Sequence, residues 1–183
     1  PLFETIDDLP QASMEAPVVT DCPGGAPAFY QFSSGTTGLK KCVPITFDEL
    51  EWQVSQYSRA INLTGHDRIV SWLPIYHDMG LIACFMLPLL TGTPLVVMSP
   101  FDWVRDPVMF LKAFSDHRGT LGWVPNFCFN LLESTVRDAD LATLYLSSVR
   151  GLINCSEPLI AESHHRFLDR FSRVGLSDSA IGA

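Results

Sequence analysis

Hydrophobic residues fall into two alternating patterns along the chain. Short apolar runs bounded by turn-forming residues predict buried strands, and longer segments with apolar residues at every third or fourth position predict helices that bury one face. The expected strands are 28–32, 42–45, 68–73, 94–98, 120–124 and 149–154, and the expected helices are 47–61, 80–90, 107–114, 126–136 and 160–174. Because strands and helices alternate, the pattern predicts a layered α/β fold with helices on both faces of a largely parallel sheet.

The start of the first long helix has a recognisable signal. Thr46 precedes the helical pattern and Glu49 stands three residues later. In a capping box, the hydroxyl accepts a hydrogen bond from the first turn and the carboxylate reaches back to the N–H of the capping residue. We therefore expect the helix to begin directly after Thr46.

The first part of the chain follows neither pattern. Residues 10–27 contain four prolines and two glycines among small side chains, which is typical of irregular structure. The predicted organisation is an irregular lead-in over 1–27 and a single domain over 28–183. Since the chain begins at Pro1 and ends in the small residues 179–183, we expect it to be a piece of a longer polypeptide.

Composition narrows the function classes. The net charge of −8 argues against nucleic-acid binding, which depends on clustered Lys and Arg. The charged fraction of 17% is below the roughly 25% usual for globular proteins, so we expect some faces to be covered by other parts of the protein. The longest apolar run, 81–90, contains Pro88 and is too short to span a membrane.

The five cysteines do not form a metal-binding or disulfide pattern. They are widely spaced, odd in number and never arranged as C-x-x-C. Buried, reduced thiols are the simplest interpretation, and together with the lack of a visible signal peptide they predict a cytoplasmic protein without a metal site built from side chains.

The segment 32–41 is the richest in candidate chemistry. It combines hydroxyl side chains, two glycines and two lysines directly after an apolar run. Glycines allow a ligand to approach the backbone closely, and successive N–H groups in such a turn form a nest for an anion. Such a cluster is also typical of an ordinary surface loop. It is not a Walker loop, because Lys41 leads into the β-branched run Cys42–Ile45 instead of a helix.

Residues 28–41, AFYQFSSGTTGLKK, resemble the phosphate-binding loop of the adenylate-forming (AMP-binding) superfamily, which includes acyl-CoA synthetases, fatty acyl-AMP ligases and peptide-synthetase adenylation domains. The chain departs from the usual pattern at Lys40, where proline is usual, and at Cys42, where glycine is usual. The resemblance implies the large N-terminal domain of such an enzyme, with its C-terminal part and the small C-terminal domain absent. The residues that it implies for nucleotide binding in this loop are Ser33, Ser34, Gly35, Thr36, Thr37, Gly38 and Lys41.

Three further segments share the resemblance. The Leu-Pro-x-x-His segment at 73–77 is similar to one that lines the acyl pocket, which implies that His77 faces the substrate carboxylate. The segment 122–129 resembles the pocket wall of the fatty acyl-AMP ligase branch, which implies that Trp123 and Asn126 contact the substrate, and the strings at 77–82 and 98–100 are similar to the same branch. The segment Asn154–Pro158 resembles one that packs along adenine, although Cys155 replaces a glycine. It implies nucleotide contacts from Ser156, Glu157 and Pro158.

The activity that the resemblance implies is ATP-dependent, Mg²⁺-assisted conversion of a carboxylic acid, expected to be a fatty acid, to acyl-AMP with release of pyrophosphate. His77 and Lys41 are the implied catalytic residues, and coenzyme A or a phosphopantetheinyl carrier protein is the implied acceptor. We expect the 183-residue chain to be inactive by itself.

Two other functions stay open at this point. The unusual residues Lys40, Cys42 and Cys155 are consistent with a nucleotide-binding or interaction module that has lost catalysis. An unrelated kinase-like NTPase is disfavoured because Lys41 leads into a strand. His164 and His165 are adjacent on a predicted helix and point about 100° apart, so they are interpreted as structural.

Overall fold

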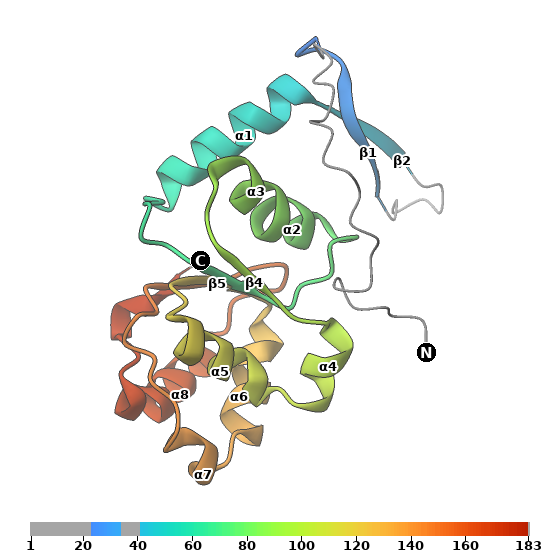
Figure 1. Cartoon of the computed structure of the whole chain (residues 1–183). Coiled ribbons are helices and arrows are strands. Elements are labelled where there is room, and N and C mark those ends of the chain that lie inside the picture. The colour runs from blue at the N-terminus through green and yellow to red at the C-terminus, as the bar shows by residue number, and fades with distance from the viewer. Residues whose placement is uncertain (1–22, 34–40, 183) are drawn as a thin grey trace, which may run out of the picture. The chain divides into compact units, whose positions relative to one another are not determined.

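A computed structural model describes residues 23–33 and 41–182 (Figure 1). The chain divides into two compact units, of which the first ends at Leu50 and the second begins at Glu51. The boundary predicted at residue 27 is a different division, and it stays a prediction. The helix α1 (Phe47–Ala60) begins in the first unit and continues in the second.

The first unit contains an antiparallel hairpin. Strand β1 (Pro27–Ser33) pairs with β2 (Lys41–Thr46), and Ser33 lies opposite Lys41 at the open end of the pairing. Residues 34–40 of the predicted phosphate loop lie outside the described residues. Lys41 begins a strand, as its β-branched successors predict.

The capping box at the start of α1 is confirmed. The N–H of Glu49 donates to Thr46 Oγ1 at 3.2 Å, and the N–H of Thr46 donates to Glu49 Oε2 at 2.9 Å. These two bonds satisfy donors that a helix start otherwise leaves unpaired.

The second unit is built on a five-stranded sheet in the order β4-β3-β5-β6-β7, and every neighbouring pair is parallel. The predicted α/β class with a largely parallel sheet is confirmed. The strands are β3 (Ile69–Ser71), β4 (Leu95–Val97), β5 (Leu121–Val124), β6 (Gly151–Asn154) and β7 (Ile181–Gly182). The two-residue strand β7 was not predicted.

Helices cover both faces of this sheet. Figure 1 shows α2 and α3 on one side of β4 and β5, with α5, α6 and α8 on the other. The helices are α2 (Asp78–Leu81), η2 (Ile82–Met86), α3 (Leu87–Thr91), α4 (Pro100–Arg105), α5 (Val108–His117), α6 (Asn126–Thr135), α7 (Asp138–Leu141), α8 (Ala161–Phe171), η3 (Ser172–Val174) and η4 (Asp178–Ala180). The pattern predicted neither α4 nor α7, which are each too short to show a hydrophobic period. Among the described residues, no helix combines the length and the apolar character needed to cross a membrane.

The side chains of the central strands are buried on both faces of the sheet. Side chains alternate between the faces of a strand, so Val70, Val124 and Leu152 enter the main core, where α5 and α8 contribute Phe114 and Phe167. Strands covered on both faces read as continuous apolar runs, which is why the sequence pattern located them.

The helical run 78–91 is continuous but changes its winding. Its middle segment, η2, is a π-helix that ends at Met86, two residues before Pro88. Proline lacks an N–H and its ring crowds the carbonyl four residues earlier, and a wider turn accommodates such a ring. The run buries Ala83, Cys84 and Leu87.

The buried carboxylate of Asp67 accepts hydrogen bonds from Arg150, Thr120 and Thr64 at the start of the sheet, and we call this group of contacts the Asp67 anchor. Asp67 is 2% exposed, and its Oδ1 accepts from Arg150 Nε at 2.6 Å and from Thr120 Oγ1 at 2.7 Å. Its Oδ2 accepts from the N–H of Thr64 at 2.8 Å. Burial alone would raise the pKa of this carboxyl, but the hydrogen bonds from Arg150, Thr120 and Thr64 hold it well below its usual range.

This anchor predicts a loss of stability in acid. The pKa of Asp67 is lower in the folded state than in the unfolded state. The stabilisation that ionised Asp67 provides is therefore fully present above the unfolded pKa of about 3.9, and it is lost as pH falls from there through the folded pKa. We expect Asp67→Asn to lower the free energy of unfolding at neutral pH by about 2 kcal/mol. The variant should also flatten the acid limb of a urea-melt series. Asp116→Asn is the matched control, since Asp116 is exposed and forms no ion pair with the described residues. An equally steep acid limb in Asp67→Asn and in the wild type would contradict the assignment.

Gly80 predicts a steric effect. A Cβ added there would overlap the carbonyl oxygen of Pro74, which also accepts from the N–H of His77 at 3.1 Å. Alanine favours helices, yet we expect Gly80→Ala to lower the free energy of unfolding by about 1–3 kcal/mol because a backbone carbonyl must move. Gly65→Ala is the control, since no atom lies within 4 Å of its added Cβ. Similar urea midpoints for the two variants would argue against the close contact.

Candidate functional site at the carboxyl edge of the sheet

The strand order identifies where ligands bind in a sheet of this kind. The chain passes from β3 outward to the edge strand β4, then returns to the other side of β3 to form β5. The direction of winding therefore reverses between β3 and β5. In open α/β sheets, the crevice outside the carboxyl ends of the strands at this reversal is the usual ligand site.

His77 follows β3 at this edge. It is the N-cap residue of α2, its side chain is exposed, and its Nδ1 lies 2.6 Å from Asp78 Oδ1. Asp78 Oδ1 also accepts from the N–H of Met79 at 2.8 Å. The turn 74–77 and the start of α2 thus present an imidazole and a carboxylate together. Asp78 was not among the predicted site residues, and its position next to a candidate histidine was its only signal.

Asn126 follows β5 and is 3% exposed. Its Oδ1 accepts from the N–H of Ile160 at 3.2 Å and from Asn154 Nδ2 at 3.0 Å, while its Nδ2 donates to Ser163 Oγ at 3.3 Å. Each of these partners follows or ends β6. The amide therefore ties the start of α6 to the segment between β6 and α8.

Trp123 lies inside the fold. Its side chain is fully buried, and its indole N–H donates to the hydroxyl of Tyr57 at 2.5 Å. The contacts of Trp123 and Asn126 are thus internal ones, and the substrate contacts expected of both residues stay predictions.

The turn after β6 has an unusual backbone. Ser156 is exposed and has a backbone φ of +68°, an angle that residues other than glycine and asparagine rarely adopt. The preceding Asn154 is 4% exposed, and its Oδ1 has no hydrogen-bond partner among the described residues. Strained backbone and unpaired polar atoms carry a cost, and such features gather at functional sites.

Glu157 has a structural partner in the same turn. Its Oε2 accepts from the N–H of Phe127 at 2.9 Å, at the start of α6. A carboxylate at a helix N-terminus satisfies an unpaired donor and interacts favourably with the helix dipole. Glu157 and Pro158 are both exposed, so the turn remains accessible. The predicted nucleotide contacts of Ser156, Glu157 and Pro158 stay predictions.

The thiols near this edge are poor nucleophiles. Burial raises the pKa of Cys155, and the negative charge of Asp78 adds to the rise. Burial also raises the pKa of Cys84 to about 12. A thiol must ionise to attack a substrate, so these cysteines stay protonated at neutral pH. Covalent catalysis by either one is disfavoured.

Apolar side chains are exposed after each of the three strands that carry the site. Ile75 and Tyr76 follow β3, Phe127 follows β5, and Leu159 and Ile160 follow β6. Tyr76 is 86% exposed. Exposed apolar groups beside polar ones are typical of ligand-binding and interaction surfaces. The predicted helix 160–174 began at Ile160, but this residue precedes the first turn of α8 and is exposed.

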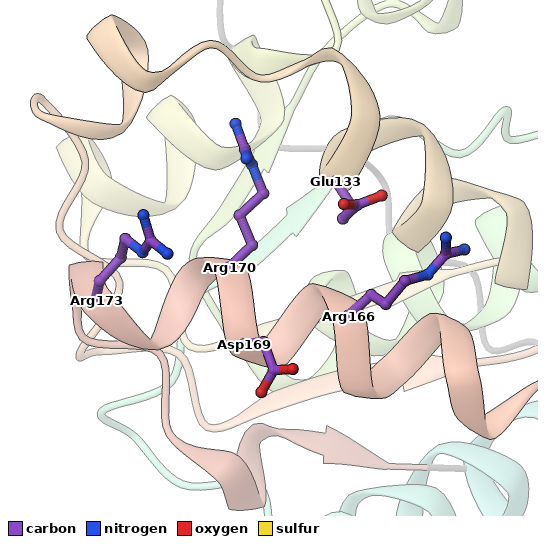
Figure 2. A pocket seen from close by; sticks show the side chains of 5 residues that line it. All are labelled: Glu133, Arg166, Asp169, Arg170 and Arg173. Carbon is purple, nitrogen blue, oxygen red and sulfur yellow. The ribbon is translucent and has the colours of Figure 1, made fainter.

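Figure 2 shows a hollow of a different character, lined by Glu133 of α6 and by Arg166, Asp169, Arg170 and Arg173. The spacing of the arginines places them on one side of α8 and η3. Arg170 donates to the carbonyl of Val136 and to Asp138, and Arg166 donates to Asn130. These bonds attach α8 to α6, to Val136 just after it and to the start of α7. We assign the hollow a structural role.

The remaining predicted residues come from the segment 33–41. Ser34, Gly35, Thr36, Thr37 and Gly38 lie outside the described residues, together with Lys40. Ser33 ends β1 and Lys41, which is exposed, begins β2. Within residues 23–33 and 41–182, no group of three His, Cys, Asp or Glu side chains is arranged to hold a metal ion.

Comparison with known proteins finds relatives over most of the chain. The sequence pattern of the family described as "AMP-binding enzyme" matches residues 3–178. The chain is 32% identical over 164 residues to the long-chain-fatty-acid–AMP ligase FadD26 of Mycobacterium marinum, covering 87% of this chain and 28% of that protein. It is 35% identical over 154 residues to the medium-chain-fatty-acid–[acyl-carrier-protein] ligase TtuA of Teredinibacter turnerae, covering 84% of this chain and 24% of that protein. The chain thus spans about a quarter of the length of these relatives.

A solved structure gives the same result for the fold. The fatty acyl-adenylate ligase from L. pneumophila, determined in complex with acyl adenylate and pyrophosphate, superposes with a TM-score of 0.84 at 30% identity. The match covers 88% of this chain and 29% of that chain.

Asn126 provides a test of how the site is held. We expect Asn126→Leu to lower the free energy of unfolding by about 2–3 kcal/mol, because the backbone N–H of Ile160 and the side-chain NH₂ group of Asn154 lose their acceptor. Asn130→Leu, on the same helix, is the control: its Oδ1 accepts from the exposed Arg166, and we expect a change of about 0.5 kcal/mol or less. Equal urea midpoints for the two variants would remove Asn126 as the tie between α6 and the β6–α8 segment.

Proposed function

Since the chain belongs to the family of AMP-binding enzymes, we propose that it forms part of the nucleotide-binding domain of an enzyme that activates a fatty acid with ATP. The products are acyl-AMP and pyrophosphate. The observation that carries the proposal is the position of His77, Asn126 and Ser156–Pro158 after the carboxyl ends of adjacent strands, at the reversal of the sheet.

The reaction needs no base. A carboxylic acid is already ionised at neutral pH, so one of its oxygens attacks the α-phosphorus directly. The bond between the α- and β-phosphates breaks, and its electron pair leaves with pyrophosphate. The enzyme has to hold the two reactants in line and to stabilise the charge that moves onto the leaving group.

The exposed imidazole of His77 would orient the acyl carboxylate. Its neighbour Asp78, 2.6 Å from Nδ1, would hold the ring in place through that nitrogen and leave Nε2 for the substrate. Asn126 and Trp123 would support the wall of the acyl site from inside, through their hydrogen bonds to Asn154 and Tyr57.

Two groups of residues are proposed to contact the nucleotide. The exposed turn Ser156–Pro158 offers backbone groups and a flat proline face to the adenine. Lys41, with Ser33, Ser34, Gly35, Thr36, Thr37 and Gly38, would supply an ammonium group, hydroxyls and backbone N–H groups to the β- and γ-phosphates. Mg²⁺, when bound, would neutralise phosphate charge, and it commonly takes most of its ligands from phosphates and water.

The acceptor of the acyl group is proposed from the relatives. The name of TtuA specifies an acyl carrier protein, and both named ligases act on fatty acids. We propose a thiol acceptor of the same chemistry, carried by a phosphopantetheinyl carrier protein or by coenzyme A.

The test is pyrophosphate exchange into ATP, measured with the full-length protein in which these 183 residues occur. We expect exchange that requires a fatty acid, and no exchange from the 183-residue chain by itself. Binding of ATP without exchange would favour a non-catalytic nucleotide-binding module, and absence of ATP binding would overturn the proposal.

Histidine variants sharpen this test. We expect His77→Ala to lower kcat/KM for the acid on the order of 10- to 100-fold through lost orientation, with an unchanged melting temperature because His77 is exposed. His66→Ala is the control, since His66 is also exposed but precedes β3 at the opposite edge. Equal kcat/KM values for the two variants would take His77 out of the site.

A further inference from the structure

The orientation of two buried amides can be worked out from one backbone donor. The N–H of Ile160 can only donate, and it lies 3.2 Å from Asn126 Oδ1. That atom of Asn126 is therefore the oxygen. Asn154 approaches the same oxygen at 3.0 Å, so it must present its NH₂ group.

The same NH₂ group of Asn154 lies 2.6 Å from Nε2 of His164. Because Asn154 is the donor, Nε2 must be an acceptor. The ring of His164 is then neutral and carries its proton on Nδ1. A protonated ring would place an N–H against an N–H at this short distance, and the contact would break.

The surroundings of His164 favour the neutral form as well. Its ring packs edge-on against Phe129 of α6 at a centroid distance of 4.8 Å, and Asn154 of β6 faces it with an uncharged amide. Burial lowers its pKa, and the charge of the neighbouring His165 lowers it further. Of the described residues, His165 is the titratable group whose charge acts on it.

The network lies directly behind the exposed turn after β6. Asn154 is the last residue of β6, Ser156 and Glu157 follow it, and Glu157 is bound to the start of α6. If the bond between Asn154 and His164 breaks, the side-chain amide of Asn154 keeps its bond to Asn126 and loses its contact with α8. The backbone of Asn154 leads directly into this turn.

We propose that neutral His164 is a positioning residue for the turn Ser156–Pro158, and that its protonation loosens this turn and weakens nucleotide binding. The second half of the proposal rests on the proposed function, in which the turn contacts the nucleotide. The proposal makes His164 an acid-sensitive support that does not touch the nucleotide.

The first experiment needs no nucleotide and no variant. Nitrogen NMR of the histidine rings in the chain would show His164 as the Nδ1–H tautomer at neutral pH, with a pKa below the ordinary value for a histidine. The amide signals of Asn154, Ser156 and Phe127 should shift with the titration of His164. An Nε2–H tautomer, or titration of His164 without those shifts, would overturn the positioning role.

The second experiment measures ATP affinity of the full-length protein by calorimetry across the titration range. We expect the dissociation constant of the wild type to rise by up to about tenfold per pH unit below the pKa of His164, the slope of one proton. His164→Gln keeps an acceptor without titrating, so its affinity should follow only the titration of ATP itself. The difference between the two profiles isolates His164.

His165→Gln is the matched control on the same helix. It should retain the pH dependence, displaced toward higher pH, because loss of its charge raises the pKa of His164. The same profile in wild type and His164→Gln would overturn the inference. Absence of ATP binding at every pH would instead overturn the proposed function, while the NMR experiment still decides whether His164 controls the turn.

Discussion

The N–H of Ile160 has a fixed polarity, and the arrangement of the candidate site depends on it. This donor requires an oxygen from Asn126, which requires an NH₂ group from Asn154. The three residues belong to the start of α6, the end of β6 and the approach to α8, so one short set of hydrogen bonds joins three segments at the carboxyl edge of the sheet. Buried amides of this kind are costly unless they are paired, and this pairing admits a single arrangement.

A rigid edge of this kind can support features that are unfavourable by themselves. Ser156 has a left-handed backbone, Asn154 has an oxygen without a partner among the described residues, and Tyr76 is exposed. Each of these carries a free-energy cost that packing elsewhere must offset. Their concentration after β3, β5 and β6 supports the proposed ligand site at this edge, because a bound ligand would offset that cost.

The residues expected at the site divide into two groups. His77 and Ser156 are exposed and available, whereas Trp123 and Asn126 are buried and hold other residues in place. Glu157 belongs to both groups, since it is exposed and also caps α6. The sequence does not separate residues that could contact a ligand from residues that support them, and only their burial distinguishes the two groups.

Local sequence determined the elements whose cause is local. The capping box at Thr46, the strand after Lys41 and the buried parallel strands all follow from side-chain period and backbone chemistry within a few residues. The short helix α4 also had a local signal, because Ser99 accepts from the N–H of Phe101 and Pro100 occupies the first turn, but it lacks the length to show a period.

The pairing of distant residues was decided only by the tertiary structure. The ion pair of Asp67 and Arg150 joins residues 83 positions apart, and the bond between Trp123 and Tyr57 joins residues 66 apart. The His164–Asn154 bond joins two elements, although only ten positions separate them. Periodicity shows which face of an element is buried, but it does not show which polar group on another element will lie opposite. For that reason the chain by itself identified the fold and the family motifs, while the protonation state of His164 and the supporting role of Asn126 depend on how the sheet brings its strand ends together.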